Sequence, residues 1–530
     1  MGLLAPKDYQ ILLLVEGRDK RTSSSSTCSN SFTLAASSKE AKNTEKKTSS
    51  SSFFCLVLLA TVISTAMIIS ILWSTGEPVL ILSLDFQRPR IQEQGPHFYG
   101  FANEPESFRL QARVSLLKAC RGLQHFSVYY HRHLLRFNWT ISPLLENEAS
   151  TIVPPKEEFV TESCRLKWQA VVEGRYRIQV RVWLHSRPET LVAQGELASI
   201  LVKDFWVVAM GDSYASGQGN PDSPVSMMGI VPATWIFPLC YRSSNSWPYM
   251  VYKMLADAYP DHGILFTYTA CAGATIQKGL IGPGPPSLRL KPQVDGVARI
   301  VKETEEYLSK LCVRKMGAGS AGAEKCKGNS TLILPDFLLL SIGGNDIGFS
   351  EIINSILWDE NFLQNRRNEA AGRRSSSSGR LDTSFASLRR DFQRLASAIG
   401  DRLRLAGSPE RVLFPHYFDV TKNERGRVDA SCKGLQAATN DKFLRAEQHI
   451  LSRLNALISG SANAYGWTAV ENVTQIFQRH GYCSREPFIL SLQDSYRRQG
   501  NRLGAFHPNE VGHFRIASLV WRKMQDMLSE

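Results

Sequence analysis

The sequence lacks the short motifs of several common enzyme and metal-binding sites. None of its ten cysteines form a CxxC pair, which argues against a zinc site built on such pairs. A Walker lysine for nucleoside triphosphates is also absent. The stretch VVAMGDSYASGQGNPD, residues 207–222, comes close to two further motifs and matches neither. Ala215 stands where the nucleophile elbow of α/β-hydrolases has glycine, and Asp222 stands where the dinucleotide fingerprint has its third glycine.

Residues 22–52 contain few large apolar side chains and are dominated by Ser, Thr, Lys, Asn and Ala. We therefore predict a disordered tail over residues 1–52. The tail ends at FFCLVLLATVISTAMIISILW, residues 53–73, which has no charged side chain. As a helix this stretch is long enough to cross a hydrocarbon core of about 30 Å. We interpret residues 53–74 as a transmembrane helix, because a buried core helix or a cleaved signal peptide fits the run and the long tail less well.

The charge on either side of this run predicts its orientation. Residues 1–52 carry eight basic and five acidic side chains, whereas the far flank opens with Glu77. Positive charge tends to stay in the cytoplasm. The chain is therefore expected to be a single-pass type II membrane protein, with everything after Trp73 in the lumen of the secretory pathway or outside the cell. Organelle and oligomeric state stay open.

Cysteines and glycosylation sequons agree with an oxidising compartment. Eight cysteines follow the predicted span, an even number. We pair them by proximity along the chain: Cys120 with Cys164, Cys240 with Cys271, Cys312 with Cys326, and Cys432 with Cys483. Three Asn-x-Ser/Thr sequons lie on the same side of the span and favour a glycosylated ectodomain, namely those at Asn138, Asn329 and Asn472.

The formal net charge of +13 does not indicate a nucleic-acid partner. Much of the excess lies in scattered arginines and in a polar low-complexity insert at residues 364–382, which we expect to be a solvated loop. No aromatic side chains for base stacking are interleaved with these arginines.

Two hydrophobic patterns divide the rest of the chain. In residues 78–203, segments such as 108–116, 175–184 and 197–204 alternate apolar and polar side chains, which predicts a small all-β sandwich domain. His131 and His133 in this part are interpreted as surface histidines. After Asp204, near-continuous apolar runs alternate with amphipathic stretches, which predicts a layered α/β domain with a parallel sheet over residues 204–530. The runs expected to form strands are 205–210, 263–269, 336–342 and 411–417.

Small-residue motifs follow three of these expected strands. They are GDSYASG with Ser213, ACAGAT with Gly273, and GGND with Asn345, and a fourth, AFHPNEVGH with His507, precedes the last expected helix. The carboxyl ends of parallel strands converge on one crevice, so these residues can meet. Ser213 would be a nucleophile activated by His507. The backbone N–H groups of Ser213 and Gly273 and the amide of Asn345 would form an oxyanion hole.

Two nearby side chains are interpreted structurally. Asp212 is expected to stabilise the turn or cap the next helix. His513 is expected to pack or form a hydrogen bond and not to act as a second base.

The order of these four motifs resembles that of the SGNH, or GDSL, hydrolase family. The residues within the motifs are most like those of the secreted esterases and lipases of actinomycetes. The resemblance covers residues 205–529 and implies a three-layer, flavodoxin-like α/β/α sandwich, no metal, no cofactor and a disulfide near the site. Many members have an aspartate three residues before the histidine, where this sequence has Gly504. In the branch that this sequence resembles, a main-chain carbonyl can orient the imidazole, and Gly504 is expected to supply it. We expect Gly504→Asp to be tolerated unless the position needs a positive φ.

The predicted function is a serine esterase or lipase that cleaves carboxylic esters through a Ser-His dyad and an acyl-enzyme. A lipid ester is the first substrate class implied by the resemblance. Two alternatives stay open: a glycan O-deacylase or acyltransferase, and a catalytically inactive ectodomain that binds a glycan or a protein partner. Asp494 and Glu510, the acids nearest to His507 in sequence, are not expected to complete a triad.

Overall fold

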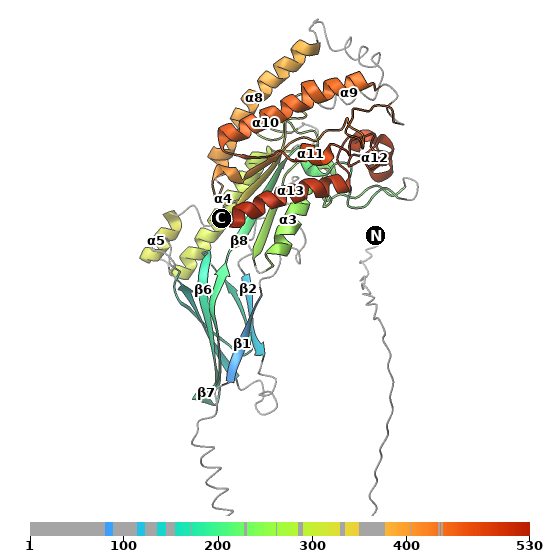
Figure 1. Cartoon of the computed structure of the whole chain (residues 1–530). Coiled ribbons are helices and arrows are strands. Elements are labelled where there is room, and N and C mark those ends of the chain that lie inside the picture. Colours follow the sequence, from blue (N-terminus) through green and yellow to red (C-terminus); the bar gives the residue numbers. More distant parts are fainter. Residues whose placement is uncertain are drawn as a thin grey trace, which may run out of the picture. The chain divides into compact units, whose positions relative to one another are not determined.

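The computed structural model describes residues 80–87, 114–121, 135–144 and 154–529, the last range with gaps at 171, 227–229, 261, 285–289, 318, 329–333, 349–376, 404, 433–434 and 436–437. Residues Glu77–Glu530 form one compact unit (Figure 1). The predicted tail and the predicted span lie outside the described residues. Within the part that is described, no helix combines the length and apolar character needed to cross a membrane.

The N-terminal described part is all β. Its strands are β1 (Leu80–Gln87), β2 (Val114–Arg121), β3 (Leu135–Leu144), β4 (Glu157–Thr161), β5 (Arg165–Gln169), β6 (Gly174–Leu184) and β7 (Arg187–Val202). They form one seven-stranded sheet in the order β4-β3-β6-β7-β1-β2-β5. The predicted antiparallel pairing is present at every contact except one, because β1 pairs with β7 in parallel.

The two ends of this sheet share one hydrophobic core. Alternate residues of β3 and β6 are buried, as the period of two predicted. Trp168 of β5 packs with its ring 4.9 Å from that of Tyr176 in β6. The Trp168 indole N–H also donates to Glu157 of β4, over 3.0 Å. Because β4 and β5 stand at opposite ends of the strand order, this contact means that the sheet folds back on itself around its core.

The second part contains a five-stranded parallel sheet. Its strands are β8 (Asp204–Gly211), β9 (Gly263–Tyr268), β10 (Phe337–Ser341), β11 (Val412–Pro415) and β12 (Thr468–Val470). The first four coincide with the predicted apolar runs, and β12 is an addition. The order is β12-β11-β10-β8-β9. Counted from β8, this is the 2-1-3-4-5 order of flavodoxin-like sheets. Every residue of β8 is buried, as expected for a strand covered on both faces.

Helices contact this sheet in two groups (Figure 1). One group contains α3 (Trp247–Ala258) and α13 (Glu510–Ser529), which pack on each other and on β9, β11 and β12. The other contains α4 (Gln293–Met316), α8 (Ser377–Arg402) and α10 (Ser452–Tyr465), which contact one another and strands β8 and β12. The amphipathic character of these segments therefore produces the layered α/β arrangement that the pattern predicted.

Shorter helices complete the second part. They are α2 (Ser213–Ser216), η5 (Pro238–Cys240), α5 (Ala321–Gly328), η7 (Pro409–Arg411), α9 (Asn440–Ala446), the π-helical turn η8 (Glu447–Leu451), α11 (Val473–Phe477), α12 (Leu492–Gln499) and η9 (Arg502–Gly504). The predicted solvated insert, 364–382, is corrected at its end. Its last six residues, 377–382, belong to the first turns of α8, because the amphipathic helix pattern begins earlier than the polar composition suggests.

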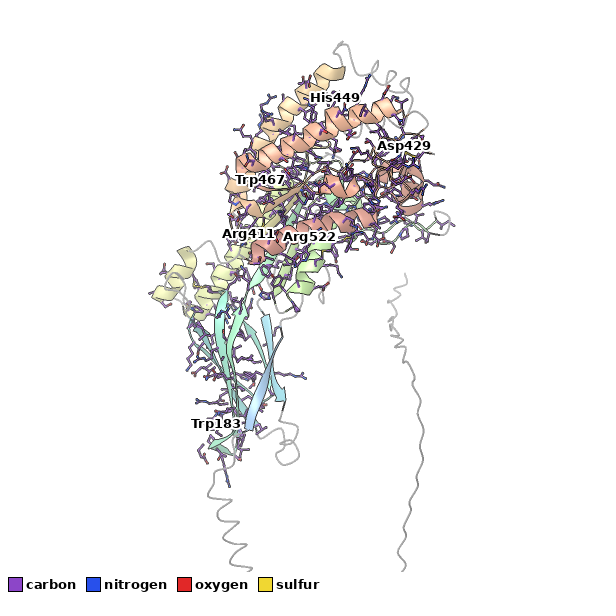
Figure 2. All side chains as sticks on the ribbon, in the orientation of Figure 1. Trp183, Arg411, Asp429, His449, Trp467 and Arg522 are labelled. Atoms are coloured by element: carbon purple, nitrogen blue, oxygen red, sulfur yellow. A yellow bond between two sulfur atoms is a disulfide. The ribbon has the colours of Figure 1, made fainter. Side chains whose placement is uncertain are left out.

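The two sheets join with a single residue between them. Lys203 separates β7 from β8, and its ammonium group lies 3.2 Å from Glu173 and 3.5 Å from Asp336. Asp336 also accepts the Trp206 backbone N–H and lies 3.7 Å from Arg411, which is labelled in Figure 2. Burial raises the pKa of Asp336 to about 6, although Lys203, the Trp206 N–H and Arg411 oppose the shift. The junction is thus a network of charged hydrogen bonds.

Candidate active site

Ser213 lies at the point where β8 ends and α2 begins. Asp212 is the N-cap residue of α2, and its carboxylate accepts the Tyr214 N–H over 3.0 Å. Gly217 ends the helix with a left-handed backbone, at φ 88°. The tight strand-to-helix turn leaves Ser213 half-buried at the carboxyl edge of the sheet. This edge includes the point between β8 and β10 where the strand order reverses, which is where open α/β sheets bind ligands.

His507 lies beside this serine although 294 positions separate them in the sequence. Its Nε2 atom is 2.8 Å from Ser213 Oγ, and its Nδ1 atom is 3.1 Å from the carbonyl oxygen of Ala505. A carbonyl only accepts, so Nδ1 carries the proton and Nε2 is left to accept from the serine hydroxyl. The structure thus assembles the predicted serine and histidine with the tautomer that general-base catalysis requires.

A second carbonyl joins the predicted Gly504 carbonyl beside the ring. Nδ1 lies 3.1 Å from the carbonyl oxygen of Ala505, one residue later, and the Gly504 carbonyl also interacts with the ring. The Gly504 carbonyl additionally accepts the backbone N–H of His507 over 3.2 Å, at the end of the 3₁₀ turn η9. Burial lowers the pKa of His507 to about 4, and the two carbonyls partly oppose this shift.

The structure argues on steric grounds against the predicted tolerance of Gly504→Asp. The backbone of Gly504 does not have a positive φ. A Cβ atom at this position would nevertheless lie 2.6 Å from the Cα of Gly219 and 3.0 Å from Ser495 Oγ. Contacts with backbone at this distance cannot be relieved by a side-chain rotation. Glycine is needed here because two main-chain segments cross closely.

The backbone next to His507 is held in an unusual conformation. Phe506 has a φ of 64° and is fully buried, which is rare for a bulky residue. Its carbonyl accepts the Tyr214 hydroxyl over 3.3 Å, and its ring stacks on Tyr482 at 4.5 Å. The Tyr214 ring also meets the His507 imidazole edge-on at 4.9 Å. The residue next to Ser213 therefore helps to hold the histidine in place.

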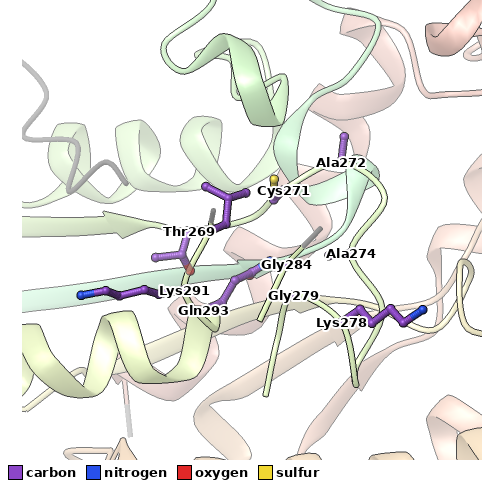
Figure 3. Close-up of a pocket in the computed structure, with 10 residues that line it drawn as sticks. Thr269, Cys271, Ala272, Ala274, Lys278, Gly279, Gly284, Lys291 and Gln293 are labelled. Carbon is purple, nitrogen blue, oxygen red and sulfur yellow. The ribbon is translucent and has the colours of Figure 1, made fainter. Parts of the chain in front are cut away.

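The loop that follows β9 carries Gly273, whose backbone has a φ of 78°. No atom lies within 4 Å of the position that its Cβ would occupy, so this backbone faces open space. The flanking N–H groups are engaged, since Ala272 donates to the Cys240 carbonyl and Ala274 to that of Cys271. The loop also lines a small pocket (Figure 3). Glycine is therefore required at 273 for its backbone conformation.

Asn345 is joined to the same loop. Its side-chain amide donates to the Ala274 carbonyl over 3.0 Å. The next residue, Asp346, accepts the Ile276 N–H, also over 3.0 Å, and burial raises its pKa to about 7. The GGND segment after β10 thus contacts the loop of Gly273 through two side chains. Sequence reasoning identified Asn345 but missed the part that Asp346 has in fixing the loop.

Tyr417 is a second residue that sequence reasoning missed. Its hydroxyl donates to Asp212 over 2.5 Å and accepts the Gly344 N–H over 3.0 Å. It thereby joins the Ser213 turn to the GGND segment. Asp212 is fully buried, which raises its pKa to about 6 although the hydrogen bonds from Tyr417, Tyr214 and Ser341 oppose the shift. The sequence did contain one indication of this role. Tyr417 lies two residues after a strand, which is where the motifs of Ser213, Gly273 and Asn345 also begin.

The other residues considered in the sequence, Asp494, Glu510 and His513, lie in helix caps or in the packed interior. Asp494 forms a capping box with Ser491 at the start of α12, and Glu510 opens α13. Among the described residues, the groups that interact with the His507 ring nitrogens are the Ser213 hydroxyl and the carbonyls of Ala505 and Gly504, and no acid is one of them. His513 is buried and accepts the Trp247 N–H over 3.2 Å, and burial lowers its pKa to about 3.

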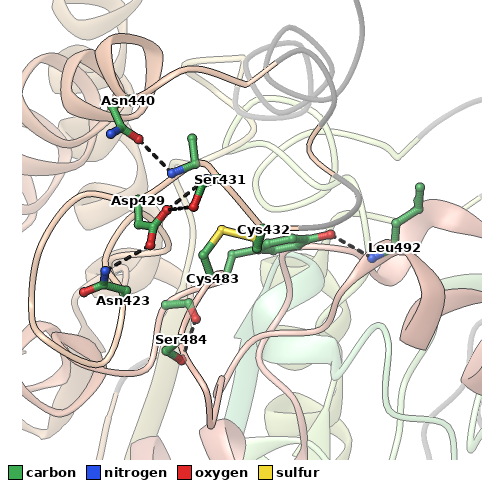
Figure 4. Close-up of a disulfide and its surroundings, with 11 residues drawn as sticks. Asn423, Asp429, Ser431, Cys432, Asn440, Cys483, Ser484 and Leu492 are labelled. Atoms are coloured by element: carbon green, nitrogen blue, oxygen red, sulfur yellow. Dashed lines mark hydrogen bonds between the residues drawn. A yellow bond between two sulfur atoms is a disulfide. The ribbon is translucent and has the colours of Figure 1, made fainter.

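Three of the four predicted disulfides are present. Cys240–Cys271 joins η5 to the loop of Gly273, Cys312–Cys326 joins α4 to α5, and Cys432–Cys483 closes a separation of 51 residues (Figure 4). Cys164 is also disulfide-bonded, but the side chain of its predicted partner Cys120 lies outside the described residues.

Two of the three sequons can be located. Asn138 and Asn472 are solvent-exposed, whereas Asn329, together with His131 and His133, lies outside the described part. Across the described residues, no group of three or more His, Cys, Asp or Glu side chains could hold a metal ion.

No protein-family model and no curated protein matches the sequence. The fold is similar to that of several solved structures. The extracellular lipase of Streptomyces rimosus is 20% identical, with a TM-score of 0.35 over 60% of this chain and 99% of the lipase. Phospholipase A1 from Streptomyces albidoflavus is 18% identical, with a TM-score of 0.33 over 60% of this chain and 98% of that chain.

A third similar structure is an active-site mutant of a family two carbohydrate esterase from Clostridium thermocellum. It is 11% identical, with a TM-score of 0.25 over 75% of this chain and 91% of that chain. At these values the likeness says nothing about substrate or mechanism. The solved structures that this chain resembles are thus lipases and carbohydrate esterases, among them a protein described as a GDSL-like lipase from Parabacteroides merdae.

Proposed function

We propose that this protein is a serine hydrolase that cleaves carboxylic esters through Ser213 and His507. The observation that carries the proposal is the 2.8 Å contact between Ser213 Oγ and His507 Nε2, together with the Ala505 carbonyl on Nδ1. These contacts supply a nucleophile, a base and a group that orients the base. If Ser213 and His507 only packed together by chance, nothing would require a carbonyl at Nδ1, the other nitrogen of the His507 ring.

The reaction proceeds in two steps, formation of an acyl-enzyme and its hydrolysis. Ser213 Oγ attacks the ester carbonyl carbon while its proton passes to His507 Nε2, and the carbonyl oxygen becomes an oxyanion. The backbone N–H groups of Ser213 and Gly273 and the amide of Asn345 are the proposed donors to this oxyanion. Collapse breaks the ester C–O bond, and the imidazolium gives its proton to the departing alcohol. Water then attacks the acyl-serine with the same histidine as base, which releases the carboxylic acid and restores Ser213.

The first test combines mutation with covalent labelling. Ser213→Ala and His507→Ala should each lower ester hydrolysis by about 10³-fold or more, because both belong to one catalytic unit. A fluorophosphonate probe should label the native protein and fail to label Ser213→Ala. Ser518→Ala is the matched control, since Ser518 is a half-buried serine whose hydroxyl donates to the Phe514 carbonyl within α13. Turnover by Ser213→Ala at the native rate would refute the proposed nucleophile.

We also propose the type II topology, with residues 53–74 as the membrane span and the hydrolase part lumenal or extracellular. The uncharged 53–73 run, the three disulfides and the two exposed sequons at Asn138 and Asn472 support it. Glycosidase treatment of the protein made in a eukaryotic host should therefore increase its mobility on a gel. Digestion of the C-terminal part by protease added outside sealed microsomes, with the tail spared, would contradict this orientation.

A further inference from the structure

Gln293 is the first residue of α4, and its side chain is buried. Both polar atoms of this side chain bond the main chain of one residue, Gly211. The Gly211 N–H donates to Gln293 Oε1 over 2.8 Å, and Gln293 Nε2 donates to the Gly211 carbonyl, also over 2.8 Å. Because a backbone N–H only donates and a carbonyl only accepts, these two bonds also fix which way the amide points. We call this pair of bonds the Gln293 clamp.

Gly211 is the residue through which the Gln293 clamp reaches the Ser213 turn. It ends β8, two positions before Ser213. Its backbone has a φ of 142°, and a Cβ atom there would collide with the Ser341 carbonyl of β10. The next N–H, that of Asp212, donates to the same Ser341 carbonyl over 2.9 Å. The clamp therefore holds the main chain at the point where the turn toward Ser213 starts.

Gln293 also contacts the loop that carries Gly273. The Gly211 carbonyl accepts a second N–H, that of Cys271, over 3.0 Å. The backbone N–H of Gln293 donates to the Gly279 carbonyl over 2.8 Å. The loop is thus fastened on both sides of Gly273, and Gln293 lines the same small pocket as Cys271 and Gly279 (Figure 3). One residue therefore joins the two segments whose N–H groups are the proposed oxyanion donors.

We propose that Gln293 is a positioning residue of the ester hydrolysis, which fixes the Ser213 turn relative to the Gly273 loop. The N–H groups of Ser213 and Gly273 have to face one oxyanion, so the placement of their segments decides how well both donate. A misplacement of about 1 Å at such a site costs up to about 10²-fold in rate. The effect on catalysis rests on the proposed hydrolase function, whereas the clamp itself can be measured without a substrate. The two ideas can therefore fail separately.

Hydrogen–deuterium exchange of the full chain tests the clamp without turnover. Gln293→Met keeps an unbranched side chain of similar length and removes both bonds to Gly211. Backbone amides of 211–217 and 271–279 should exchange at least about fivefold faster in this variant. Val301→Ala is the matched control, because Val301 is also buried and lies about two turns further along α4. It should leave both segments unchanged. Unchanged exchange in Gln293→Met would overturn the proposal.

Kinetics with a monomeric ester test the catalytic effect. Gln293→Met should lower kcat by about 10²-fold and leave KM nearly unchanged, because the clamp places groups that act on the transition state. Val301→Ala should keep both constants. A native kcat in folded Gln293→Met, or a change in KM alone, would overturn the positioning role. Absence of hydrolysis and of fluorophosphonate labelling in the native protein would instead refute the hydrolase function and leave the clamp standing.

Gln293→Glu separates hydrogen bonding from shape, because the bonding of a carboxyl group changes with pH. A protonated carboxyl has a donor and an acceptor, as the native amide has, and matches the carbonyl and the N–H of Gly211. An ionised carboxyl has acceptors only and repels the Gly211 carbonyl. Burial raises the pKa of a carboxyl above its ordinary value of about 4.3. Of the charged groups nearby, Lys278 and Lys291 in the adjoining pocket oppose this shift, and Asp212 reinforces it.

The ratio of kcat in Gln293→Glu to kcat in the native protein should therefore fall as the pH rises. We expect a ratio within about threefold of unity at pH 5, and a value at least about tenfold lower at pH 8. The rising limb set by His507 is common to both proteins and cancels in the ratio. Circular dichroism at each pH checks that the variant stays folded. A ratio that does not change with pH would overturn the proposal, and this variant decides the question even if Gln293→Met does not fold.

Discussion

At the scale of single residues, the environment of His507 predicts the pH dependence of the reaction. The imidazole must be neutral to accept the Ser213 proton, and burial lowers its pKa to about 4. Activity should therefore rise with pH through about 4 and be near its plateau by about 5.5, whereas an ordinary histidine would place this limb near 6.5. The measurement is kcat/KM for a monomeric ester between pH 3.5 and pH 8. Asp212→Asn removes the carboxyl whose pKa is raised to about 6, and a limb near 6.5 that persists in this variant would contradict the lowered pKa of the half-buried His507 imidazole.

Gly504 gives a second prediction at this scale. Gly504→Asp should fold less stably, by about 1–3 kcal/mol, and lose most activity, because its Cβ would push against the Gly219 backbone beside the serine loop. Chemical denaturation and ester hydrolysis measure the two effects. Gly460→Ala on α10 is the control, since no atom lies within 4 Å of the new Cβ, and it should keep activity. Native stability of Gly504→Asp would show that the two segments can separate.

The residues that sequence reasoning found and missed differ in kind. Ser213 and His507 were predicted to meet because acyl transfer needs a nucleophile beside a base, and the structure places Ser213 Oγ 2.8 Å from His507 Nε2. Gly273 and Asn345 were predicted from the motifs that follow two strands, and the structure joins their loops. Tyr417 was not, since its function depends on a three-dimensional meeting of two loops. The carbonyl of Ala505 beside Nδ1 was not predicted together with that of Gly504, because every residue has a carbonyl and only the backbone path determines which ones meet the ring.

At the scale of elements, the cap of α12 separates a structural acid from a catalytic one. Asp494 accepts the Ser491 hydroxyl over 2.6 Å in a capping box. Asp494→Asn should lower the free energy of unfolding by about 0.5–1 kcal/mol and keep activity within about tenfold. Glu510→Gln at the start of α13 should behave alike. Thermal unfolding and kcat provide the comparison. A loss of several orders of magnitude in kcat with normal folding would mean that His507 has a carboxylate partner.

The elements themselves were predictable to different degrees. The four long apolar runs became β8 to β11, because strands buried on both faces leave a strong signal. The three-residue β12 was missed, since so short a strand has no period of its own. The parallel pairing of β1 with β7 was also missed. Alternation of apolar and polar residues shows which face of a strand is buried, but not whether the neighbouring strand is parallel or antiparallel.

At the scale of the whole molecule, Lys315 couples the two parts. Its ammonium group lies 2.7 Å from the Glu157 carboxylate of β4 and donates to the Gln169 carbonyl over 2.6 Å, with both charged side chains largely buried. Lys315→Met should lower the free energy of unfolding by about 1–3 kcal/mol, because Glu157 would lose its charged partner. The second substitution Glu157→Gln should recover part of the loss. If the double variant loses as much in its denaturation midpoint as the two single variants together, the coupling is contradicted. Ester hydrolysis should be unaffected in all three variants.

The junction at Lys203 has a consequence for how the protein can be divided. One residue between two strands cannot serve as a flexible linker, and this one is bonded to Glu173 on one side and Asp336 on the other. Asp204, the next residue, is buried and donates its N–H to Glu173 over 2.9 Å. A chain begun at residue 204 would lose Glu173, the acceptor of the Asp204 N–H, and would place a terminal ammonium at a buried position at the start of β8. The part with the parallel sheet is therefore not an independent module, and any engineered or shortened form has to keep the β sheet that leads into it.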